Sequence, residues 1–148
     1  MIIKIINEIN IINYENWREY YIQYLIFNKN KIKERNLKKL WEWLNNPLHP
    51  QKGIFAIIEK NIVGHAHYRG SPNPVRGKDI GFLDDIYVNP KYRNTGVAYK
   101  IIEKLSIEGK KNKWELIRWN CGSENTNAIN FYSKFAKKLE WHTFEIKI

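Results

Sequence analysis

Apolar residues recur along this chain with two different spacings. A recurrence every three or four residues is typical of a helix, whereas alternation or a short continuous run is typical of a strand. The helical spacing is found in residues 14–27, 32–44, about 96–109 and about 126–137. The strand pattern is found in residues 2–6, 54–59, 62–68, 80–88, 114–121 and 140–148. The pattern therefore predicts elements in the order β-α-α-β-β-β-α-β-α-β.

Turn-forming and capping residues separate these elements. Asn13 is placed to cap the first helix, and Asn45-Asn46-Pro47 ends the second. Residues 59–61 read as a hairpin turn, and residues 71–77, which contain two prolines, as a loop. Asn89-Pro90 closes a strand, because proline has no N–H to donate. Helices alternating with strands favour an α/β fold with a mixed sheet, formed as one domain by residues 1–148.

Length and composition exclude several classes of protein. A chain of 148 residues suits a single domain, and 43% hydrophobic residues exclude a disordered chain. No apolar run reaches the roughly 18 residues that a membrane span needs. Lys4 and Glu8 interrupt the apolar beginning of the chain, so we expect no signal peptide, no membrane association and a cytoplasmic location. Cys121 is the only cysteine, which excludes an internal disulfide.

The formal net charge of +10 is the most unusual feature of the composition. A basic surface attracts phosphate groups, as in proteins that bind nucleic acids. However, the lysines are scattered and accompany many isoleucines and asparagines, as expected from the coding bias of an AT-rich genome. We therefore do not expect nucleic acid to be the partner, although a positive field would help to capture another anionic ligand.

A short loop between a strand and a helix carries the clearest chemical signal. The strand of residues 80–88 is followed by Arg93-Asn94-Thr95-Gly96-Val97-Ala98, where the next helix begins. Unpaired N–H groups and the positive end of the helix dipole make such a site suitable for a phosphate group. The order of residues matches neither the dinucleotide fingerprint nor the Walker loop.

The loop resembles the (Arg/Gln)-x-x-Gly-x-(Gly/Ala) pyrophosphate loop of the GNAT superfamily of acetyl-CoA-dependent N-acetyltransferases. The strand end Ile86-Tyr87-Val88-Asn89-Pro90 is also similar to that family, and so are Asn125, Ala128 and Tyr132 further along the chain. The resemblance covers essentially the whole chain. It implies a mixed, mostly antiparallel central sheet flanked by helices.

By this resemblance, acetyl-CoA is the co-substrate and no metal is required. Backbone N–H groups from Asn94 to Ala98 would hold the pyrophosphate, and Arg93 would add positive charge. The family usually has glycine where Asn94 stands, but asparagine accepts a positive φ better than most residues. Asn125 would cap a helix and bond the pantetheine arm. The cofactor-binding residues implied are Ile86, Tyr87, Val88, Arg93, Asn94, Thr95, Gly96, Val97, Ala98, Asn125 and Tyr132.

The resemblance also implies two catalytic residues. Tyr132 stands where the family has the tyrosine that protonates the coenzyme A thiolate, a role that suits a phenol of pKa about 10. The segment Leu83–Val88 is similar to a segment of spermidine/spermine N-acetyltransferases, whose glutamate matches Asp84. Asp84 would accept the amine proton through water or hold a cationic substrate. Because neighbouring residues of a strand face opposite sides, we expect only one of Asp84 and Asp85 to reach the cleft.

His65 and His67 form a further candidate pair. Two residues apart on a strand, they face the same side of the sheet and could ligate a metal ion. No third ligand has a suitable spacing in the sequence. We therefore favour ordinary packing or a polar contact to substrate, and expect no metal site.

The sequence thus predicts an N-acetyltransferase that moves an acetyl group from acetyl-CoA to the primary amine of a small molecule by direct attack. A polyamine, a diamino acid or an amino acid would serve as the substrate, and a homodimer is expected from the resemblance. A protein lysine or N-terminal acetyltransferase is one alternative. A non-catalytic acyl-CoA-binding or basic nucleic-acid-binding domain is the other.

Overall fold

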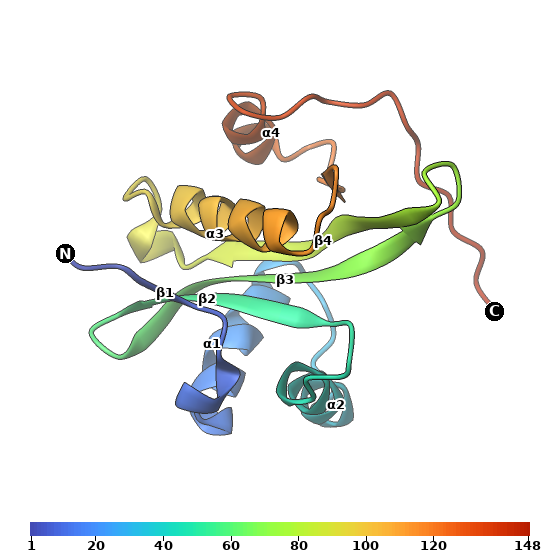
Figure 1. The fold of residues 1–148 in the computed structure, drawn as a ribbon. Helices are drawn as coiled ribbons and strands as arrows, with labels where there is room; N and C mark the ends of the chain where they lie inside the picture. Colours follow the sequence, from blue (N-terminus) through green and yellow to red (C-terminus); the bar gives the residue numbers. More distant parts are fainter.

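A computed structural model describes residues 1–148 as a five-stranded sheet with helices on both faces. Helices α1 and α2 lie on one face, and α3 and α4 lie on the other (Figure 1). The strands are β1 (Lys4–Ile6), β2 (Lys52–Ile58), β3 (Asn61–Asn73), β4 (Lys78–Val88) and β5 (Ile117–Trp119). The helices are α1 (Tyr14–Phe27), α2 (Glu34–Asn45), α3 (Val97–Lys111) and α4 (Thr126–Tyr132), with short 3₁₀ helices at Ile9–Ile11 and Pro90–Tyr92.

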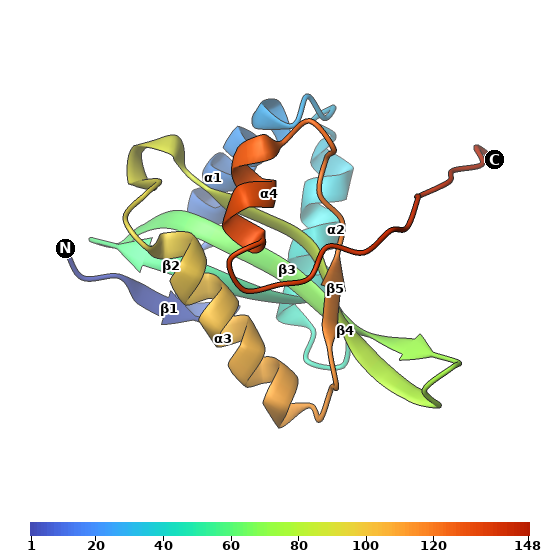
Figure 2. The same cartoon turned by 90° about the horizontal axis from the view of Figure 1, so that it is seen from above.

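The sheet is mixed and mostly antiparallel, as predicted. Its strands follow the sequence order β1-β2-β3-β4-β5. The first four strands pair antiparallel with their neighbours, and only β4 and β5 are parallel. A parallel pair needs a crossover, and α3 supplies it above the sheet (Figure 2). This crossover places the start of α3 directly after the end of β4.

The sheet separates two apolar cores. The core under α3 is built around Ile101 and Leu105, which have the predicted helical spacing. The core under α1 and α2 is built around Trp17, which is fully buried. Helix α1 has the predicted bounds, and Asn13 caps it by accepting a hydrogen bond from the Asn16 N–H at 2.8 Å. Periodicity and capping were sufficient to define this helix.

The predicted loop at residues 71–77 is wrong over its first part. Strand β3 continues to Asn73, and Pro72 pairs with Asp79 in β4. Proline is tolerated there because β2 pairs with β3 only as far as Tyr68. Beyond that point β3 is an edge strand on one side, where a missing N–H costs no ladder bond. The two strands thus form a long hairpin that extends beyond the rest of the sheet (Figure 1).

The predictions for the C-terminal part were the least accurate. Strand β5 is shorter than the predicted 114–121, and α4 ends at Tyr132 instead of continuing to residue 137. Beyond it, the Ser133 hydroxyl bonds to the Ile129 carbonyl, a local contact that competes with helix propagation. The predicted strand at residues 140–148 is absent. That segment is exposed and pairs with no strand of the chain.

None of the helices has both the length and the apolar character that crossing a lipid bilayer requires.

Candidate active site

A cleft opens where β4 and β5 part. The two strands pair only from Gly81 to Leu83 on β4, opposite Ile117 to Trp119 on β5. Beyond this pairing lies a cavity of about 140 Å³, which is closed on its third side by α4. Five residues that the proposed chemistry uses line it, namely Asp84, Asp85, Ile86, Asn125 and Tyr132. The carboxylates and the tyrosine predicted from the sequence therefore meet in one place.

A β-bulge in β4 brings both Asp84 and Asp85 to the lining of this cleft. His67 of β3 is paired with Asp85, and the next residue, Tyr68, is paired with Leu83, so Asp84 has no partner. An extra residue of this kind interrupts the alternation of side chains along a strand. The expectation that only one aspartate reaches the cleft is therefore wrong, because it assumed a regular strand.

Asp84 is held by two neighbours at the edge of the cleft. Its Oδ1 accepts a hydrogen bond from Arg69 Nε at 3.0 Å, and its Oδ2 accepts one from Gln51 Nε2 at 3.1 Å. Gln51 lies in the loop between α2 and β2, so the α2 side of the molecule reaches the carboxylate directly. The two contacts fix the orientation of a carboxylate that remains accessible from the cleft.

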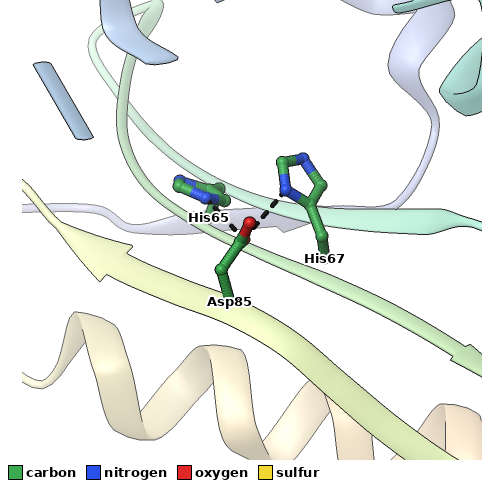
Figure 3. A group of neighbouring side chains, drawn as sticks. All are labelled: His65, His67 and Asp85. Atoms are coloured by element: carbon green, nitrogen blue, oxygen red, sulfur yellow. Dashed lines mark hydrogen bonds and ion pairs between the residues drawn. The ribbon is translucent and has the colours of Figure 1, made fainter. Parts of the chain in front are cut away.

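Asp85 lies at the centre of a buried cluster with two histidines (Figure 3). Its Oδ1 is 2.9 Å from His65 Nε2 and 2.8 Å from His67 Nδ1. Its Oδ2 accepts a longer bond from the Tyr21 hydroxyl at 3.4 Å. Burial opposes the charged form of Asp85, but His67 and His65 outweigh it and hold the pKa of this carboxyl well below its usual range. Asp85 is therefore ionised.

His65 is fully buried and neutral. Burial lowers the pKa of His65 below its ordinary 6.5, although Asp85 acts in the opposite direction. The Tyr20 hydroxyl lies 3.0 Å from Nδ1 and 3.1 Å from the Tyr87 carbonyl. Because the ionised Asp85 can only accept, the single proton of the neutral His65 ring is assigned to Nε2, which donates to Asp85. His67 differs, because neither of its ring nitrogens makes a hydrogen bond of good geometry despite its burial.

The same three side chains form a set of potential metal ligands. Their nitrogen and oxygen atoms lie within 4.8 Å of one another. Two imidazoles and a carboxylate are ligands that divalent transition metals accept. No third ligand has a suitable spacing in the sequence, but the structure brings one, Asp85, to the histidines from the neighbouring strand. The absence of a metal site stays a prediction.

The cluster predicts that stability falls on acidification. The pKa of His65 is lower in the folded chain than the ordinary 6.5, so below pH 6.5 the unfolded chain binds more protons. The contribution of the neutral His65 to the free energy of unfolding is complete above pH 6.5, and it is lost as the pH falls below that value. For one such group, we expect the free energy of unfolding to decrease by up to about 1.4 kcal/mol per pH unit.

Urea unfolding between pH 7.5 and pH 5 would measure this dependence. His142 lies in the exposed C-terminal segment, so His142→Gln is the matched control and should keep the same pH dependence. A free energy of unfolding that stays constant or rises on acidification would contradict a neutral, buried His65.

Tyr132 ends α4 on the other side of the cleft. Its ring packs edge-on against Trp119 of β5, with 5.3 Å between ring centroids. Burial, with a smaller effect of Cys121, raises the pKa of Tyr132 to about 12. The phenol is therefore protonated at neutral pH and able to donate. Asn125 begins the same helix, and its Oδ1 accepts a bond from the Ala128 N–H at 3.2 Å, so the predicted cap is confirmed.

The loop before α3 offers a row of free backbone donors. None of the N–H groups from Asn94 to Tyr99 donates a hydrogen bond within the chain. Asn94 has φ 60° and Gly96 has φ 86°, so both adopt the left-handed conformation that turns successive N–H groups outward. Free donors at the start of a 15-residue helix fit an anion such as a phosphate group.

Arg93 takes a different position from the one expected. Its Nε donates to the Val88 carbonyl at 3.1 Å, and its guanidinium lies over the ring of Phe27 at 4.8 Å. The side chain is thus turned toward the end of β4 and α1. In this arrangement the anion-binding character of the loop comes from its backbone.

The free edge of β4 borders the cleft. The Asn89 N–H donates to the Val63 carbonyl, which places it on the side of β3. Successive N–H groups of a strand point to alternate sides, so those of Ile86 and Val88 point to the opposite edge of β4. Strand β5 does not extend along this part of β4. These donors are available to an extended ligand, whereas the Tyr87 side chain is buried on the α1 side.

Sequence reasoning missed the role of Asp85 and its connection to the histidines. The only signal was the His-x-His spacing on one strand and the acidic pair on the next. Their contact depends on strand register and on the bulge, and neither follows from local sequence.

The comparison with protein families gives a match over most of the chain. Residues 12–136 match the model of the acetyltransferase (GNAT) family. The chain is 31% identical over 91 residues to thialysine N-epsilon-acetyltransferase of Bos taurus, a match that covers 58% of this chain and 53% of that protein. The chain therefore spans about half the length of that relative.

Solved structures agree with the fold. Ribosomal-protein-alanine N-acetyltransferase of Brucella melitensis has a TM-score of 0.78 and 18% identity, with 100% of both chains covered. The aminoglycoside N-acetyltransferase AAC(6')-Iy in complex with CoA has a TM-score of 0.71 and 17% identity, with 99% of this chain and 98% of that chain covered. At these identities the likeness establishes the fold alone. With the family match over residues 12–136, it follows that the chain belongs to the GNAT acetyltransferase family.

Proposed function

We propose that this chain transfers an acetyl group from acetyl-CoA to the primary amine of a small molecule. The main observation in support is that Asp84, Asp85 and the protonated Tyr132 line one cleft, beside the free edge of β4. Carboxylates attract a cationic amine, and a phenol supplies a proton to a departing thiolate. Family membership supports acetyl-CoA as the acyl donor.

The loop before α3 would hold the pyrophosphate of acetyl-CoA. The free N–H groups from Asn94 to Tyr99 support this assignment. The pantetheine arm would lie along β4, where Ile86 and Val88 offer backbone groups in the manner of an added strand. The same N–H groups would stabilise negative charge on the thioester oxygen during the reaction. Asn125 and Tyr132 would contact the arm from α4.

The chemistry is a direct transfer. The amine nitrogen attacks the thioester carbonyl carbon, a C–N bond forms, and the C–S bond breaks. The amine must first lose a proton, which Asp84 would accept through a water molecule. The departing sulfur takes the proton of Tyr132. The attacking nitrogen loses its second proton to solvent as the amide forms, and solvent returns a proton to the phenolate of Tyr132. Cys121 is exposed, and its thiol has no hydrogen-bonded base, so no covalent acyl-enzyme is needed.

The acceptor is proposed to be a polyamine, a diamino acid or an amino acid. Asp84 and Asp85 are adjacent acidic groups in a cleft of about 140 Å³. Such a site suits a slender cationic chain, since two carboxylates can attract an ammonium group. The relative from Bos taurus is named for acetylation at an N-epsilon nitrogen, which supports an amine at the end of a side chain.

Thermal stability with and without acetyl-CoA tests the proposal, followed by thiol release against polyamines, diamino acids and lysine peptides. A ligand that binds only the folded chain stabilises it by about 2.7 kcal/mol at a hundredfold excess over its dissociation constant. Stabilisation together with thiol release from one small amine would support the proposal. If thiol is released only with lysine peptides, the substrate is a protein and not a small molecule. Stabilisation without release would indicate an acyl-CoA-binding domain, and no stabilisation would contradict the cofactor site.

Gly96→Val should weaken acetyl-CoA binding by roughly tenfold, because a side chain disfavours the left-handed conformation by about 1–2 kcal/mol. The structure has open space around the missing Cβ, so the effect comes from the backbone at φ 86°. Gly77→Val is the matched control. Gly77 also has a positive φ, of 63°, with open space around it, but it lies in the β3–β4 turn. Calorimetric titration with acetyl-CoA should show a lower affinity for Gly96→Val than for Gly77→Val. Equal affinities of the two variants would contradict pyrophosphate binding by the loop before α3.

A further inference from the structure

Two arginines flank a phenylalanine on one face of the sheet. Strand register pairs Phe82 of β4 with Arg69 of β3 on one side and with Arg118 of β5 on the other. Residues directly opposite each other on neighbouring strands point to the same face. Ile117 and Trp119 pack against the core under α3, so Arg118 points to the face of α1 and α2 (Figure 1). The row formed by Arg69, Phe82 and Arg118 therefore lies on the α1 and α2 side of the sheet.

This row presents positive charge that the chain itself does not neutralise. Arg69 donates to Asp84 through Nε alone, and its Cζ lies 4.9 Å from the centre of the Phe82 ring. Arg118 is half-buried and has no ion-pair partner within the chain. A guanidinium group is a planar fork of N–H donors that matches the two oxygens of a carboxylate. Arg118 is therefore suited to bind an anionic group from outside the chain.

The row lies next to the place where the amine would react. Phe82 precedes Asp84 by two residues of β4, which is at most about 7 Å along a strand. Gln51 of the α2–β2 loop holds the Asp84 carboxylate, so this carboxylate is reached from the same side of the sheet as the arginines. Helix α3, whose start is assigned to the pyrophosphate, lies on the other face (Figure 1). An acceptor molecule that approaches Asp84 from the α2 side therefore passes the two arginines.

We propose that Arg118, together with Arg69, binds a carboxylate of the acceptor molecule. The inference rests on the proposed acetyl transfer and selects one class of acceptor, an amino acid with a second amine at the end of a short carbon chain. The terminal amine would lie at Asp84, the carboxylate at Arg118, and the carbon chain over the ring of Phe82.

The same row disfavours the other two classes of acceptor. A polyamine has no anionic group, and its second ammonium would meet like charge at the arginines. An amine bonded to the α-carbon of an amino acid is too close to the carboxylate to span two residues of β4. The arginines therefore act as determinants of specificity, and they take no part in the transfer of the acetyl group.

Initial rates of thiol release with L-lysine, L-lysinamide and cadaverine test this carboxylate site. The three amines share one carbon chain, but lysinamide has a neutral amide in place of the carboxylate and cadaverine lacks the group. Because hydrogen bonds between charged groups are the stronger ones, kcat/KM should be at least about tenfold higher for lysine than for either of the others. Lysine and lysinamide differ in charge and hardly in shape, so their comparison isolates the carboxylate.

Arg118→Met removes the charge and keeps an unbranched side chain. The preference for lysine over lysinamide should fall at least about tenfold, mainly through the KM of lysine. Calorimetric titration of lysine into the chain saturated with coenzyme A measures the same contact without turnover, and the variant should bind at least about tenfold more weakly. Arg35→Met is the matched control, since Arg35 is an exposed arginine of α2, and it should keep both the preference and the affinity.

The outcomes separate the carboxylate site from the acetyl transfer. Equal kcat/KM for lysine and lysinamide would overturn the site and leave the transfer intact. A lysine preference or affinity that survives Arg118→Met would likewise overturn it. Lysine that binds through Arg118 without thiol release would support the site and contradict the transfer. If lysine neither binds nor supports release, the site is overturned, whichever other amine the chain acetylates.

Discussion

Tyr132→Phe is expected to lower the turnover number by about a hundredfold or more, within the range of 10²–10⁴ attributed to general acid–base catalysis. The ring packs against Trp119, and phenylalanine keeps that contact while removing the proton donor. Because the hydroxyl makes no hydrogen bond within the chain, its removal leaves no buried partner unsatisfied. The affinity for acetyl-CoA should therefore change much less than the turnover number.

Initial rates and calorimetric titration of the same preparations would separate turnover from binding. Tyr68→Phe is the matched control, since it removes a phenol hydroxyl from the apolar core under α3, outside the cleft. It should retain the turnover of the unmodified chain. An equal turnover of Tyr132→Phe and the unmodified chain would exclude Tyr132 as the proton donor. A parallel loss of acetyl-CoA binding would indicate a structural role instead.

Asp85→Ala is expected to lower the free energy of unfolding by about 3–5 kcal/mol. The carboxylate is the only acceptor for the Nε2–H of His65, and it is the nearest charged group to His67. Removing it leaves two imidazoles in the interior without their partner. His65, a buried polar group, loses its hydrogen bond at a cost of about 1–3 kcal/mol, and the buried His67 in addition loses the carboxylate that lies 2.8 Å from its Nδ1.

Asp84→Ala provides the comparison for this experiment, because the same side chain is removed one residue earlier. The ion pair of Asp84 with Arg69 is partly exposed, so its loss should cost no more than about 1 kcal/mol. Chemical unfolding at pH 7.5 would measure both variants. If the two substitutions cost the same, Asp85 does not organise the buried cluster. In the activity assay Asp84→Ala should instead show the larger defect, because the proton-acceptor role is assigned to Asp84.

The two aspartates illustrate how the fold changes the meaning of a sequence motif. Side chains at adjacent positions of a regular strand point to opposite faces, and on that basis only one was expected in the cleft. The bulge at Asp84 places both beside it. A bulge depends on how β3 and β4 are paired, and this pairing is set by contacts along the whole hairpin. The histidine cluster likewise requires β3 and β4 to be in register.

The sequence by itself determined those features that depend on neighbouring residues. Helix α1 with its Asn13 cap and the start of α3 near Gly96 follow from periodicity and capping, and the positive φ of Asn94 agrees with the tolerance of asparagine for that conformation. Each of these arises within a few residues of the chain. The resemblance to the acetyltransferase family likewise rested on short motifs, such as Asn125 with Tyr132.

Only the tertiary structure decided which of these features meet and what remains unpaired. The alternation in residues 140–148 predicted a strand, and that prediction is wrong, because a strand forms only where another strand supplies its hydrogen bonds. No strand of the same chain does so. The Asp85 cluster required the register of β3 and β4, and the cleft required β4 and β5 to part after Leu83. Local sequence specifies which conformation a segment favours, whereas pairing and burial depend on surfaces that come together only when the chain folds.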